Sequence, residues 1–131
     1  MKHTVPIARA LLSLLGLTLI VLGVLFWTGR ALALLPLHML LGLLFVVCLW
    51  VLVGAALYAR SSRGLALVVF LWSLIVPSLG MAQLRLLPGS LHWVIQSAHL
   101  LVGLIAMGLG HALARRIPRS AAEAGAAPEK A

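Results

Sequence analysis

Residues 89–116, GSLHWVIQSAHLLVGLIAMGLGHALARR, decide the fold of this chain. The stretch is long enough to cross a bilayer as a single helix, because about 20 apolar residues suffice. Yet it carries three histidines and a glutamine. Ionisable side chains inside a membrane are costly, and they usually face the interior of a helix bundle and serve a function. The segment therefore predicts a membrane-spanning helix with a functional face.

That face is defined by the spacing of the polar residues. At about 100° per residue, His92, Gln96, His99 and Gly103 follow one another along one stripe of the helix. His111 comes twelve residues after His99 and is rotated about 120° away from the stripe. One side of the helix thus presents imidazoles and then a glycine.

The composition of the whole chain excludes a soluble domain. Its 131 residues are 63% hydrophobic, with a mean hydropathy of +1.17, whereas soluble domains are about half apolar. The two acidic residues, Glu123 and Glu129, lie near the C-terminus, so the apolar part cannot perform catalysis with paired carboxylates. The net charge of +8 comes from cations that flank apolar segments, which indicates membrane topology rather than nucleic-acid binding.

Four apolar segments predict an all-α integral membrane protein with a four-helix transmembrane bundle. Residues 1–117 form this domain, and the Ala, Glu, Gly and Pro residues of 118–131 predict a disordered cytoplasmic tail. The basic head and the residues Ala31-Leu32-Ala33 also suit a cleaved signal peptide, although the first apolar run exceeds a typical signal core. The expected spans are about 5–27, 34–59, 65–84 and 90–114.

The distribution of Lys and Arg predicts the orientation. With the N-terminus inside, eight of the ten cations fall on the cytoplasmic side, and only Arg30 and Arg85 lie outside. Both termini are therefore expected in the cytoplasm, and a bacterial inner (plasma) membrane is the expected location.

A weak internal repeat relates the second span to the fourth. Residues 37–43, LHMLLGL, resemble residues 98–104, AHLLVGL, and each lies in the second helix of a helical hairpin. Two hairpins of the same orientation would be parallel repeats about an axis along the membrane normal. The second and fourth helices would then lie diagonally, with His38 and His99 facing each other across the core.

Two facing neutral imidazoles suit the axial ligands of a haem iron. Gly42 and Gly103, one turn past the histidines, lack side chains and could make room for the macrocycle. Arg30 and Arg85 on the outer side suit the haem propionates, and Gln96 near the outer interface suits a quinone or an oxidant.

Two His-x-x-x-Gly motifs, at His38 and His99, on a small hydrophobic four-helix bundle resemble the transmembrane b-type cytochromes of the bis-histidine kind. The resemblance implies one haem b near the outer leaflet, held between the second and fourth helices, and electron transfer, with quinol as a candidate donor. The paired histidines of the two-haem members are not matched, because Trp50 stands at the place that corresponds to His111.

A count of depth favours a different second ligand. His38 lies 22 residues before Arg60, whereas His99 lies 16 residues before Arg115, a mismatch of about 9 Å along parallel helices. His92, 23 residues before Arg115, matches His38 better. The repeat and the deeper position favour His99, and His92 remains a second candidate.

Readings without a cofactor also fit the pattern. A histidine near a helix end is often interfacial, and His92 adjoins Trp93 in a position typical of an aromatic belt. The chain could then be a cofactor-free accessory subunit of a larger membrane complex, a homo-oligomer, or a small transporter or channel with a polar path past His92, Gln96 and His99.

Overall fold

The computed structural model describes residues 3–83 and 85–125, and the side chains of those up to residue 117. The described part is α-helical, without strands, and two short 3-10 turns precede the second and fourth helices. Four segments are long and apolar enough to cross a membrane. The helices are α1 (Thr4–Trp27), α2 (Leu35–Tyr58), α3 (Arg63–Ala82) and α4 (His92–Gly125), and the turns are Leu32–Leu34 and Gly89–Leu91.

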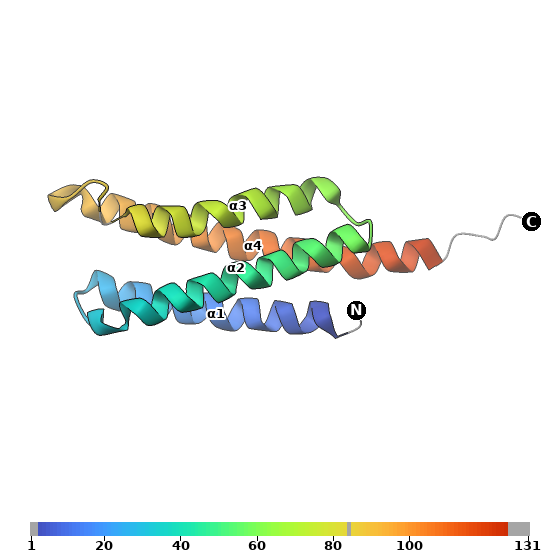
Figure 1. Cartoon of the computed structure of the whole chain (residues 1–131), viewed down its shortest axis with the longest axis horizontal. Coiled ribbons are helices and arrows are strands. Elements are labelled where there is room, and N and C mark those ends of the chain that lie inside the picture. The colour runs from blue at the N-terminus through green and yellow to red at the C-terminus, as the bar shows by residue number, and fades with distance from the viewer. Residues whose placement is uncertain (1–2, 84, 126–131) are drawn as a thin grey trace, which may run out of the picture.

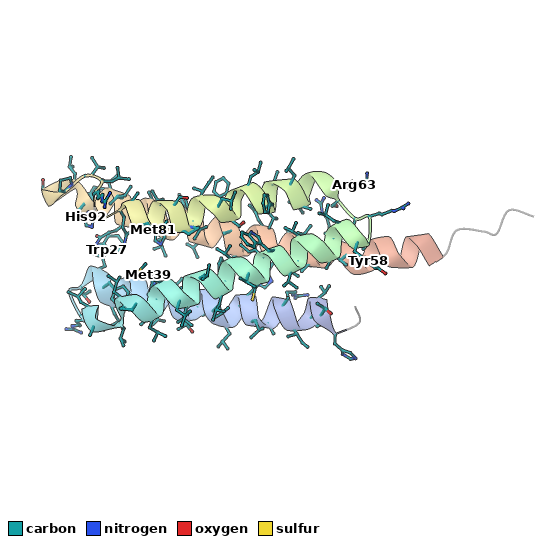
Figure 2. All side chains as sticks on the ribbon, in the orientation of Figure 1. Trp27, Met39, Tyr58, Arg63, Met81 and His92 are labelled. Carbon is teal, nitrogen blue, oxygen red and sulfur yellow. The ribbon has the colours of Figure 1, made fainter. Side chains whose placement is uncertain are left out.

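The four helices lie lengthwise beside one another (Figure 1). Helices α1 and α3 each contact α2 and α4, and α2 and α4 also contact each other across the bundle, whereas among the described residues α1 and α3 do not touch. In cross-section, α2 and α4 are therefore the diagonally opposite helices that lie close together. We call the end that carries Trp27, Met39, Met81 and His92 the histidine end, and the end that carries Tyr58 and Arg63 the terminal end (Figure 2).

The turn between α1 and α2 has a clear local cause. Gly29 has a φ of +72°, a left-handed conformation that glycine adopts at little cost. Its N–H bonds to the Phe26 carbonyl and that of Arg30 to the Leu25 carbonyl, the paired bonds of a Schellman motif that ends a helix. Pro36 then lies in the first turn of α2, where its missing N–H leaves no helical bond unmade.

The tightly packed core occupies the terminal half of the bundle. Its buried members come from residues 5–12, 45–56, 66–69 and 106–117. Leu12, Leu49, Leu52 and Leu113 are fully buried there. No residue of the corresponding histidine half belongs to this cluster within the described part of the chain. The main buried cluster thus lies in the terminal half, whereas Leu22 and Ile95 are buried in the histidine half outside this cluster.

Helix α4 ends later than the sequence predicted. It was expected to end near residue 114 and to be followed by a disordered tail, but it continues to Gly125. The extension includes Ala121, Ala122 and Ala124, and alanine has the highest helix propensity. Residues 126–131 of the expected tail lie outside the described residues.

Candidate functional site

The candidate site lies on two matching stripes of α2 and α4. Each α4 member follows its α2 counterpart by 61 residues, so the repeat seen in the sequence extends along both helices. A Cβ added to Gly110 would lie 2.6 Å from the Leu49 Cδ2 atom, which places these two counterparts side by side. The stripes are His38, Gly42, Phe45, Leu49 and Leu52 on α2, and His99, Gly103, Ala106, Gly110 and Leu113 on α4.

This contact fixes the relative depth of the two histidines. His38 lies eleven residues before Leu49, and His99 lies eleven residues before Gly110. Since α2 and α4 run in the same direction and rise about 1.5 Å per residue, both histidines lie about 16 Å from the same contact. The expected 9 Å mismatch came from aligning Arg60 with Arg115, which the packing of the helices does not do.

The glycines of the two stripes differ in how closely other side chains pack against them. A Cβ on Gly110 would meet Leu12 and Leu49 at 2.6 Å, so side chains already occupy the space beside that glycine. A Cβ on Gly42 or Gly103 would meet nothing within 4 Å. The two predicted glycines therefore border open space, one turn from each histidine.

The structure brings His38 and His99 together. Both rings are half-buried at the histidine end of the bundle. The Nδ1 atom of each ring is buried and has no hydrogen-bond partner. A buried polar atom without a partner costs about 1–3 kcal/mol, so each of the two atoms needs an explanation.

Residues of α1 and α3 complete the surroundings of the pair. The Phe26 ring meets the His38 ring edge-on, with 5.3 Å between centroids and 67° between planes. On the other side, a Cβ on Gly80 would lie 3.0 Å from the His99 Cε1 atom, so the His99 ring rests against the bare backbone of α3. All four helices thus contribute to the histidine pair.

Sequence reasoning missed both Phe26 and Gly80. Phe26 precedes Trp27, and its aromatic ring was indistinguishable from an interfacial anchor. Gly80 stands in an aliphatic run next to Met81, where a glycine usually signals helix packing. The available signal was position, since both residues lie close to the histidine ends of their helices, as His38 and His99 do.

The other predicted residues lie around the pair without bonding to it. His92 is the first residue of α4, about 10 Å farther toward the histidine end than His99, and it is half-buried, as is Gln96. Arg30 and Arg85 are exposed in the two loops of this end. None of these four side chains hydrogen-bonds to His38 or His99.

Trp50 and His111 are related by the same offset of 61 residues as His38 and His99, but their side chains bond to α3 and α1 and not to each other. Trp50 donates its indole N–H to the Ser73 hydroxyl on α3, at 2.9 Å. His111 shares a hydrogen bond of 3.1 Å with the Ser13 hydroxyl on α1. Each residue therefore ties its helix to a neighbouring helix.

The donor set is restricted to the two imidazoles. Within the described residues, no group of three or more His, Cys, Asp or Glu side chains is placed to hold a metal ion. Cys48 is buried at a distance from the pair, in the terminal half of α2. A metal held by His38 and His99 would need its remaining ligands from a macrocycle or another added group.

Comparison with protein-family models, with curated proteins and with solved structures found no match for this chain. The chemistry of the site therefore has to be argued from its own residues. Those residues are two unpartnered imidazoles, the open space beside Gly42 and Gly103, and an edge-on aromatic ring.

Proposed function

We propose that this chain is a small b-type cytochrome of the membrane, with His38 and His99 as the axial ligands of one haem b between α2 and α4. One observation carries the proposal. The two imidazoles share the histidine end of the bundle, each has a buried nitrogen without a partner, and open space lies beside Gly42 and Gly103. Buried nitrogens in protein cores are usually hydrogen-bonded, and a metal ion is one partner that would satisfy these two.

The residues present fit a haem in their chemistry. Neutral imidazole is a good ligand for iron, and the His38 and His99 rings would be the protein ligands of the haem iron. An apolar macrocycle needs an apolar cavity, and no charged side chain is buried among the described residues. When bound, the haem would supply reversible one-electron oxidation and reduction.

The surrounding residues would orient the ligands and interact with the polar edge. Phe26 on the His38 side and Gly80 on the His99 side restrict the positions that the two rings can take. Arg30 and Arg85, exposed at the same end, are the cations available to the propionates. Gln96 and His92 are half-buried near this end and are candidates to hydrogen-bond to a quinol that donates electrons.

The proposal includes only one haem per chain. A second haem would need another facing pair nearer the terminal end, but the stripes there carry Leu49, Leu52 and Leu113, which fill the core. His111 bonds instead to Ser13 on α1. With both termini in the cytoplasm, as the cations favour, the haem would lie near the outer leaflet of a bacterial inner membrane.

The absorption spectrum of the purified full-length protein tests this proposal. The protein is expressed with a haem supply, and haem is quantified against protein. We expect one haem per chain, an intense Soret band, and reduction of the bound haem by a soluble quinol. A protein that purifies folded but colourless, and that takes up no added haem, would replace this proposal with a cofactor-free accessory subunit.

A further inference from the structure

A groove between α1 and α2 lies outside the histidine site. Its volume is about 570 Å³, and it is open on one side. Because both helices span the membrane by length and composition, the open side faces the lipid. Ile7, Leu11 and Leu15 of α1 and Leu44, Val47 and Val51 of α2 form most of its walls.

The groove is polar at one end and apolar over the rest of its length. His3 and Thr4 line it at the terminal end, and Leu15 and Leu44 line it at its deep end. From Thr4 to Leu15 the helix rises about 16 Å, which is close to half of the roughly 30 Å hydrocarbon thickness of a bilayer. The groove therefore extends from the membrane surface to the midplane, the depth of one leaflet.

The polar end of the groove belongs to the positively charged end of the bundle. Arg60 is exposed in the loop after α2, and Arg63 is exposed as the first residue of α3. Arg115 is exposed on α4 at the same end of the bundle. No acidic side chain lies among the residues whose side chains are described. Cations next to a membrane surface attract anionic lipid headgroups, each contributing about 1 kcal/mol.

We propose that this groove binds one acyl chain of an anionic phospholipid from the leaflet on the terminal side, with the lipid phosphate near His3 of the groove and Arg60, which follows the α2 wall. The length of the groove matches one leaflet, its walls match a hydrocarbon chain, and the charge at its polar end matches a phosphate. The site is separate from the histidine pair, so its test does not depend on haem.

The test is native mass spectrometry of the full chain, purified in detergent with equal amounts of phosphatidylglycerol and phosphatidylethanolamine. We expect the wild-type protein to retain one phospholipid, with phosphatidylglycerol favoured several-fold. Leu11→Trp places a bulky side chain in the groove and should abolish retention. Leu14→Trp is the control, because Leu14 is 63% exposed on α1 and does not line the groove.

Two further variants keep the test decisive. If Leu11→Trp does not fold, Val47→Trp fills the groove from the other wall, with Leu43→Trp as its control. Arg60→Gln should weaken the preference for phosphatidylglycerol, whereas Arg63→Gln, on α3 and away from the α1 wall of the groove, should not. The site is refuted if the filled variants retain lipid like their controls, if both lipids bind equally, or if a second protein chain takes the place of the lipid.

Discussion

The packing of Gly110 makes a quantitative prediction about the terminal half of the bundle. A methyl group added by Gly110→Ala would lie 2.6 Å from the Cδ2 atoms of both Leu12 and Leu49. These leucines are fully buried, so a shift of either side chain disturbs the core around it. Overpacking of this kind costs about 1–3 kcal/mol. Gly108→Ala, two residues earlier on the same helix, meets nothing within 4 Å and serves as the control.

The comparison between the two variants isolates the packing effect. Alanine stabilises a helix relative to glycine by about 0.5–1 kcal/mol, and this gain applies to both substitutions and cancels in the difference. Unfolding in mixed micelles, with increasing denaturing detergent and far-UV circular dichroism as the readout, should therefore show Gly110→Ala less stable than Gly108→Ala by about 1–3 kcal/mol. Gly16→Ala should lie between them, because its 2.6 Å contact is with the flexible Met107 side chain. Equal stability of all three would refute the packing described for α2 and α4.

Three more predictions concern the histidine end and the topology. His38→Ala and His99→Ala should each remove one iron ligand, so that the absorption spectrum becomes high-spin or haem is lost. His92→Ala should keep a low-spin spectrum. If His92→Ala loses the low-spin spectrum and His99→Ala keeps it, His92 is the second ligand in place of His99. Gly42→Leu and Gly103→Leu should insert into the membrane and lose haem, measured as haem per purified protein, and unchanged haem in both would show that these glycines do not make room for a ring. A reporter fused to the C-terminus should behave as cytoplasmic, and an external signal would reverse the orientation of every histidine.

Much of the fold follows from the sequence, because apolar length alone determines where a chain can cross a membrane. The runs around Val21, Leu43 and Leu71 were long and uniform enough to predict three helices, and the fourth was recognised in spite of its histidines. The extension of α4 to Gly125 was missed, because a composition of Ala, Glu, Gly and Pro suits both a helix and a disordered segment.

The candidate site was predictable only in part. The repeat of His-x-x-x-Gly pointed to His38 and His99, and in the structure the contact of Gly110 with Leu49 sets the repeat positions of α2 and α4 side by side. The count of residues from Arg60 and Arg115 was misleading, because arginine side chains are long and do not fix the height of the backbone. The contacts with Phe26 and Gly80 depend on the relative height of all four helices, which no local pattern in one helix determines.

The electron paramagnetic resonance spectrum of the oxidised, purified protein tests most directly whether two facing imidazoles hold one haem. With His38 and His99 both bound, the spectrum should be that of low-spin ferric haem, at one spin per chain, and it should persist in the His92→Ala variant. A high-spin signal from the wild-type protein, or no haem signal from a folded protein supplied with haem, would contradict the bis-histidine site.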